Sequence, residues 1–314
     1  MKFKTLFAFL LCFAGLSLNN SALSASGKIK IVTTTSTFAS IAKDIAGDKA
    51  DVYFIASPNR DIHFISPTPK DVMKVKNTDV LIHAGLDLEV WRAPLLDAVG
   101  RLDLMWPTGE KQIDVSKGIS LLEVPTNLSR AQGDIHAYGN PHYWLDPLNG
   151  RIIAENIAEG LGRLYPKDAT FFRKNAHAFQ NKIENKMKDW ENEMSCCKGA
   201  FAVTYHHSWP YFMERFGLDL IGDLEPKPGI PPTAKHLEQL IRIMKEKGAK
   251  VIIKEVFNES RTPDKLARET GASVLTLFSE VGESKEGADY FSLFDYDVRL
   301  LKEAIQTLKK NAHE

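Results

Sequence analysis

Several histidines of this 314-residue chain stand directly after segments that read as buried strands. His63 follows the strand-like run 51–56, and the pair His206 and His207 follows the run 200–205. In open α/β sheets ligands bind at the carboxyl ends of the strands, so these side chains are expected to converge on one crevice. Neutral imidazole combined with carboxylate suits Zn²⁺, and also Mn²⁺ or Fe²⁺. The sequence therefore predicts a site for a divalent transition metal.

Further candidate ligands stand at similar positions. His142 lies in the loop NPHYWLDP, and Glu255 and Glu280 each follow a strand-like run. Three histidines and one or two carboxylates could therefore surround one metal ion. The chain carries no HExxH or CxxC motif, so this prediction depends on the placement of the residues at strand ends.

The adjacent histidines of YHHSWPYF are not expected to serve one centre together. Neighbouring side chains point about 100° apart on a helix and to opposite faces of a strand. The other histidines divide into two groups. Those on predicted helices or at the tail are expected to be solvated, namely His177, His236 and His313. Two stay open, as residues of the rim or as supports of the ligands: His83 and His136.

Strands and helices alternate twice along the chain, which predicts an α/β fold with two (β/α) lobes and mostly parallel sheets. The lobes are predicted at 26–165 and 195–314, joined by one long rigid helix at 166–194. In this linker the apolar residues recur at spacings of three and four, as in an amphipathic helix. About 29 residues at roughly 1.5 Å each would make a rod of about 40 Å.

Residues 1–25 have a basic start, a short apolar run and a small-residue exit, which predicts a cleaved signal peptide and a periplasmic protein. Lysine plus arginine and aspartate plus glutamate number 40 each, so no charge excess points to nucleic acid. Cys196 and Cys197 are neighbours, and adjacent cysteines do not readily reach ordinary disulfide geometry. We expect two free thiols, with a strained vicinal bridge as the alternative.

Four segments carry a family resemblance. DIHFISPTPKDVMKVKNTDVLIHAGLDLEVW is similar to an Asp-Pro-His-x-Tyr-x-Pro-Thr-Pro-x-Asp block, and NPHYWLDP resembles an Asp-Pro-His-x-Trp-Leu-Asp-Pro block. YHHSWPYFMERFGL is similar to a His-Asp-x-aromatic-x-Tyr-Phe segment, and LTLFSEVG occupies the place of a terminal acidic loop. Together they resemble the periplasmic zinc- and manganese-binding receptors of ABC importers, including the adhesin-type metal receptors. The resemblance implies two lobes bridged by one helix, with a metal ion held between them and delivered to the membrane permease.

Position in these motifs implies the ligand set. His63 and His142 match the ligands of the first lobe, and His206 matches the first ligand of the second lobe. His207 stands where relatives have an acid, so it is expected beside the site. Glu280 falls where many members have an aspartate ligand, one methylene shorter. The predicted set is therefore these three histidines and Glu280, with water as the alternative fourth ligand.

Other interpretations stay open from sequence. Glu255 is a lesser candidate ligand, and could equally support the ligands or face the permease. The bound metal is expected to be Zn²⁺, with Mn²⁺ or Fe²⁺ possible. A secreted zinc hydrolase would need an open coordination position and a general base, and a structural or adhesive surface protein is a third class. We expect a monomer that is not an enzyme and whose partners are a divalent metal ion and an ABC permease.

Overall fold

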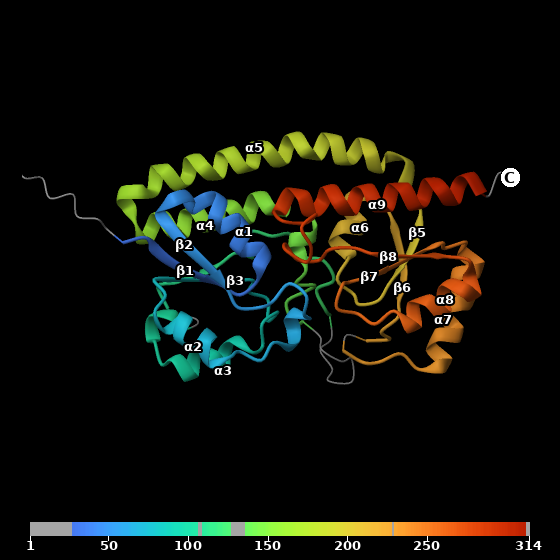
Figure 1. Cartoon of the computed structure of the whole chain (residues 1–314), viewed down its shortest axis with the longest axis horizontal. Coiled ribbons are helices and arrows are strands. Elements are labelled where there is room, and N and C mark those ends of the chain that lie inside the picture. Colours follow the sequence, from blue (N-terminus) through green and yellow to red (C-terminus); the bar gives the residue numbers. More distant parts are fainter. Residues whose placement is uncertain (1–26, 106–108, 127–135, 228, 312–314) are drawn as a thin grey trace, which may run out of the picture.

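The computed structural model describes residues 27–105, 109–126, 136–227 and 229–311. The predicted signal peptide, residues 1–25, lies outside the described residues. Within the described ranges no helix is long and apolar enough to cross a membrane. The molecule consists of two α/β lobes side by side beneath one long helix (Figure 1). The predicted fold class is confirmed.

The N-terminal lobe contains a parallel four-stranded sheet in the order β2-β1-β3-β4. Its strands are β1 (Ile29–Thr33), β2 (Ala50–Phe54), β3 (Val80–His83) and β4 (Gln112–Asp114). The helices of this lobe are α1 (Ser36–Ala46), α2 (Pro69–Lys76), α3 (Arg92–Val99) and α4 (Asn149–Leu164). At the start of α2, Thr68 and Asp71 form a capping box, with Pro69 in the first turn.

The C-terminal lobe repeats this arrangement with a parallel sheet in the order β6-β5-β7-β8. Its strands are β5 (Phe201–Thr204), β6 (Asp219–Asp223), β7 (Val251–Lys254) and β8 (Ser273–Thr276). Its helices are α6 (Pro210–Phe216), α7 (Ala234–Lys247), α8 (Arg261–Thr270) and α9 (Tyr290–Asn311). In each sheet the first strand in sequence lies second from the edge, so the two lobes share one strand order.

The long helix α5 (Ala169–Met194) connects the two sheets along the chain and lies across both lobes (Figure 1). It begins three residues later than predicted, because Pro166–Asp168 form a 3₁₀ turn (η6) before it. One face is buried, and its members are those of the predicted apolar stripe: Phe172, Ala176, Phe179, Ile183, Met187, Trp190 and Met194. The exact lobe boundaries stay a prediction.

Helix α9 packs along α5 and also reaches the N-terminal lobe (Figure 1). It spans Tyr290–Asn311. The hydroxyl of Tyr290 donates to the carbonyl of Trp144 at 2.9 Å, and the ring lies so close to Gly150 that an added Cβ would approach within 2.5 Å. The lobes are therefore joined by packing of α9 as well as by the linker helix.

Candidate metal centre

Three buried imidazoles meet between the lobes. His63, His142 and His206 each offer a ring nitrogen, and these atoms lie within 4.8 Å of one another. Their ring centroids are 5.1, 5.2 and 5.5 Å apart. The three residues are only 4–7% exposed. The structure thus brings together the three histidines predicted from sequence, although they lie far apart along the chain.

The two ligand candidates of the N-terminal lobe are oriented by the same local device. His63 lies in the 3₁₀ turn η2 (Ile62–Phe64), and Oδ1 of Asp61 accepts hydrogen bonds from its backbone N–H and from Nδ1, both at 2.9 Å. Oδ1 of Asn140 accepts the equivalent two bonds from His142, both at 3.0 Å. With Nδ1 protonated in this way, Nε2 of each neutral ring presents a lone pair to the centre.

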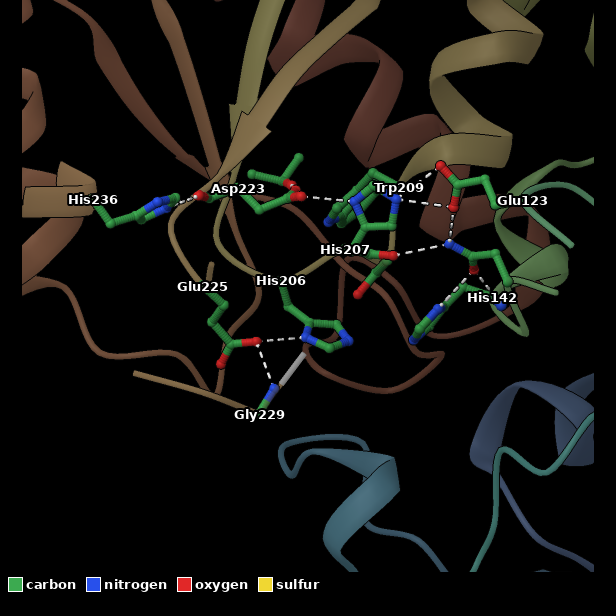
Figure 2. Close-up of polar contacts among 12 residues, drawn as sticks. Glu123, His142, His206, His207, Trp209, Asp223, Glu225, Gly229 and His236 are labelled. Carbon is green, nitrogen blue, oxygen red and sulfur yellow. Dashed lines mark hydrogen bonds and ion pairs between the residues drawn. The ribbon is translucent and has the colours of Figure 1, made fainter. Parts of the chain in front are cut away.

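His206 follows β5 and is oriented by a distant residue. Its Nδ1 lies 2.7 Å from Oε2 of Glu225, which also accepts the backbone N–H of Gly229 at 3.1 Å (Figure 2). Burial lowers the pKa of His206, but the hydrogen bond with Glu225 and the nearby carboxylate charges outweigh it, so the pKa is raised overall. A metal ion must therefore displace a proton held more tightly than in free histidine.

His142 and His136 show the opposite shift. Burial, reinforced by the charges of His63 and His206, holds the pKa of His142 well below its usual value. The same causes lower the pKa of His136 to about 3. Both rings are therefore neutral at physiological pH, as metal ligation requires.

His207 bridges two carboxylates, Asp223 and Glu123 (Figure 2). Its Nδ1 lies 2.7 Å from Oδ2 of Asp223, and its Nε2 lies 2.8 Å from Oε1 of Glu123. Burial lowers the pKa of His207, but these two hydrogen bonds dominate and raise it to about 10. Asn140 completes the connection, because its amide donates to Glu123 at 3.0 Å and to the His207 carbonyl at 3.1 Å. Of the adjacent pair, only His206 faces the centre.

Glu280 is buried near the lobe interface but does not join the histidine group. Its Oε2 accepts hydrogen bonds from Ser36 Oγ, from the Thr37 backbone N–H and from Thr37 Oγ1, at 3.1, 3.0 and 2.7 Å. Oε1 has no hydrogen-bond partner among the described residues. Burial outweighs these hydrogen bonds and raises the pKa of Glu280 to about 7. Its role as fourth ligand stays a prediction.

Glu255 supports the segment that carries the histidine pair. It is fully buried, and its Oε1 accepts hydrogen bonds from Ser208 Oγ at 2.8 Å and from Trp209 Nε1 at 3.0 Å. Burial raises the pKa of Glu255, although the charge of His206 opposes that shift. Glu255 therefore lies behind His206 and not among the three imidazoles.

The remaining histidines differ from one another. His177 is exposed on α5, as predicted, whereas His313 lies outside the described residues. The prediction that His236 is solvated is wrong, because its Nε2 donates to the Asp223 carbonyl at 2.9 Å from a half-buried position. His83 is buried in the N-terminal lobe, and its Nδ1 accepts the Gly85 N–H. His136, which the sequence left open, lies beside the centre with its Nε2 only 3.2 Å from Nε2 of His63.

The two cysteines are both free. Cys197 is buried and its Sγ lies 3.6 Å from Sγ of Cys196. Burial, followed by the contact with Cys196, raises the pKa of the Cys197 thiol to about 12. The expectation of two free thiols is confirmed, and neither lies among the three imidazoles.

Comparison with known proteins finds metal-binding relatives. Zinc-binding protein AdcA of Streptococcus pyogenes serotype M1 is 27% identical over 290 residues, which cover 88% of this chain and 56% of AdcA. The chain thus spans just over half the length of that relative. Iron-binding protein YfeA of Yersinia pestis is 30% identical over 305 residues, 93% of this chain and 91% of YfeA.

Solved structures share the fold. A crystal structure of ZnuA superposes with a TM-score of 0.76 at 24% identity, over 89% of this chain and 100% of that chain. The family model described as zinc-uptake complex component A, periplasmic (ZnuA), matches residues 31–304. Because that match covers most of the chain, this protein belongs to the family of periplasmic component A proteins of zinc-uptake complexes.

Proposed function

We propose that this protein is an extracytoplasmic metal receptor that captures Zn²⁺ between its lobes and delivers it to the membrane permease of an ABC importer. The observation that carries the proposal is the convergence of His63, His142 and His206, two from one lobe and one from the other. Family membership supports the role in transport. We propose that this function is binding and release, without catalysis.

The arrangement suits reversible capture. Each Nδ1 is held by an oxygen acceptor, so the rings are oriented before the ion arrives and Nε2 remains free to bind it. Because the ligands come from two lobes, a small separation of the lobes would remove His206 from the other two histidines. Release would then need no change in the local anchors of the N-terminal lobe.

The donor set supports zinc as the cargo. Imidazole suits Zn²⁺, whereas carboxylate and water are the preferred ligands of Mn²⁺. The names of relatives span several metals, since they include zinc-binding AdcA, iron-binding YfeA and a manganese transporter lipoprotein, PsaA of Streptococcus pneumoniae. Three imidazoles in one centre favour the zinc assignment for this chain. Glu280 stays the ligand predicted from sequence for the fourth position.

A zinc hydrolase would require a carboxylate base facing bound water. The two buried carboxylates that the sequence offers, Glu255 and Glu280, each have one oxygen held by hydrogen bonds. Glu255 accepts hydrogen bonds from Ser208 and Trp209, and Glu280 accepts them from the first turn of α1. Neither carboxylate lies among the three imidazoles, which supports capture of the ion over hydrolysis.

The proposal is tested by competitive titration of the purified protein with Zn²⁺, Mn²⁺ and Fe²⁺ against a metal-sensitive dye. We expect zinc to bind most tightly, and His206→Ala to lose about 100-fold in zinc affinity, since a four-ligand zinc site stabilises by about 10–16 kcal/mol. His207→Ala is the adjacent comparison and should lose much less. His177→Ala, on the exposed face of α5, is the control for a histidine outside the site.

Two outcomes would contradict this assignment. Hydrolysis of simple esters or peptides that disappears in His206→Ala would favour the hydrolase. Loss of zinc binding in His207→Ala with retention in His206→Ala would reverse the roles of the adjacent pair.

A further inference from the structure

A fourth imidazole lies against the centre. His136 precedes the NPHYWLDP segment, and its ring centroid is 5.1 Å from that of His63 and 6.3 Å from that of His142. The closest contact is between the two Nε2 atoms of His136 and His63, at 3.2 Å. Each ring therefore directs its Nε2 toward the other, and His136 lies just outside the group of His63, His142 and His206, whose nitrogens are all within 4.8 Å of one another.

The other nitrogen of each ring is already committed to an acceptor. Nδ1 of His63 faces a carboxylate oxygen of Asp61, which can only accept. The imidazole of His136 has its other hydrogen bond with the backbone of Asp87, and this bond raises its pKa, as donation to a carbonyl does. If either Nε2 carried a hydrogen in a neutral ring, the opposite nitrogen would face its acceptor with a lone pair. Both Nε2 atoms therefore present lone pairs to each other.

Two converging lone pairs repel unless a cation lies between them. A tetrahedral zinc ion with Zn–N bonds of about 2.0–2.1 Å holds its nitrogen ligands about 3.3–3.4 Å apart. The observed separation of 3.2 Å between Nε2 of His136 and Nε2 of His63 is close to that ligand-to-ligand distance. The spacing of these two nitrogens thus matches a shared metal ion.

The carbonyl that anchors His136 belongs to an unusual turn. Gly85, Leu86 and Asp87 have consecutive positive φ angles of 70°, 54° and 57°, directly after β3. For Leu86 and Asp87 this conformation is strained by about 1–3 kcal/mol and persists only where the surroundings enforce it. Gly85 is required, because an added Cβ would lie 2.5 Å from Oδ1 of Asp114. The strained turn presents the Asp87 backbone to His136.

We propose that His136 is a ligand of the bound metal and completes a four-imidazole site with His63, His142 and His206. This inference rests on the proposed function, since it names a donor of the same site. A fourth nitrogen favours Zn²⁺ over Mn²⁺, for which oxygen donors are preferred. It also competes with Glu280, whose Oε2 is held by three hydrogen bonds from the start of α1.

The test compares His136→Ala, Glu280→Gln and the control His177→Ala in the whole protein. We expect His136→Ala to lose at least 10-fold in Zn²⁺ affinity and to change Mn²⁺ affinity by less, because the lost donor is an imidazole. X-ray absorption of the zinc-loaded protein should count four imidazoles in the control and three in His136→Ala. Thermal melts of the metal-free proteins establish that each variant is folded.

The outcomes separate this inference from the proposed function. An unchanged zinc affinity and an unchanged imidazole count in His136→Ala overturn the inference, whereas loss of binding in His206→Ala in the same experiment still supports the receptor. A loss in Glu280→Gln without a loss in His136→Ala assigns the fourth position to the carboxylate. If the wild-type protein binds none of the metals, the proposed function itself fails.

Discussion

The two lobes share one strand order but hold their ligands by different means. In the N-terminal lobe, His63 and His142 are each oriented by the residue two positions earlier, Asp61 or Asn140, which binds both the backbone N–H and Nδ1. In the C-terminal lobe, His206 is oriented by Glu225, which lies 19 residues further along the chain. The first lobe thus uses local anchors and the second uses a tertiary one.

This difference has a structural cause. Glu225 reaches His206 because the parallel pairing of β5 with β6 continues beyond the strands, where the Glu225 N–H donates to the Tyr205 carbonyl at 3.0 Å. The ladder also shifts register between Ala202 and Thr204. The orientation of His206 therefore depends on the folded sheet, whereas the anchors of His63 and His142 need only a short turn.

The largest effect is expected from removing the tertiary anchor. Glu225→Ala should lower zinc affinity by about 100-fold at neutral pH, at the upper end for a residue that orients a metal ligand. Asp61→Ala should cost about 10-fold, because the η2 turn still restricts His63. Competitive zinc titrations of the two variants measure the difference.

Rescue by the conservative variant identifies orientation as the cause. Glu225→Gln keeps an oxygen that can accept from Nδ1 of His206, so it should recover most of the lost affinity. Equal losses in Glu225→Ala and Asp61→Ala would show that local and tertiary anchors are equivalent. A Gln variant no better than Ala would show that the carboxylate charge is what matters.

An intermediate effect, on stability, is expected at the bridge between the lobes, in which His207 contacts Asp223 and Glu123. His207 has a pKa raised to about 10, so the folded protein retains a proton that the unfolded chain loses above its ordinary value near 6.5. Its contribution to stability is present below pH 6.5 and is lost as the pH rises through 10. The side chains of His207 and Glu123 are 32% and 45% exposed, so screening limits the contribution to about 1–2 kcal/mol.

Urea unfolding of the metal-free protein between pH 6 and 10 tests this bridge. The free energy of unfolding of the wild type should fall with pH more steeply than that of His207→Gln, which has no titrating ring. Other buried groups, such as Glu283 with its pKa raised to about 8 by burial, titrate in both proteins and cancel in the comparison. Parallel pH profiles would mean that the bridge between the lobes contributes no stability.

The features of the fold and of the site that depend on local sequence could be predicted. The apolar stripe predicted for the linker helix matches the buried face of α5. The three histidines could be found because each follows a strand or stands in a motif block. Strands β4 and β6 were missed, since three to five half-buried residues carry little periodic signal.

The rest of the site depends on tertiary contacts. Glu225 gave no signal in the sequence, because only the pairing of β5 with β6 brings it to His206. The contact between His236 and the Asp223 carbonyl could not be predicted either, because it joins α7 to β6 in the folded lobe. His136 was visible as a histidine in the loop before NPHYWLDP, but its distance from His63 is set by the strained turn at Asp87.

The smallest effect is expected from exchanging one local anchor for the other. Asp61 and Asn140 hold their histidines with the same two contacts, one through a carboxylate and the other through an amide. Asp61→Asn should therefore keep both hydrogen bonds and lower zinc affinity by less than about 10-fold, through the reduced basicity of His63 alone. The measurement is a zinc titration beside Asp61→Ala. If the two variants lose equally, the charge of Asp61 and not its geometry orients His63, and the two local anchors resemble each other in shape only.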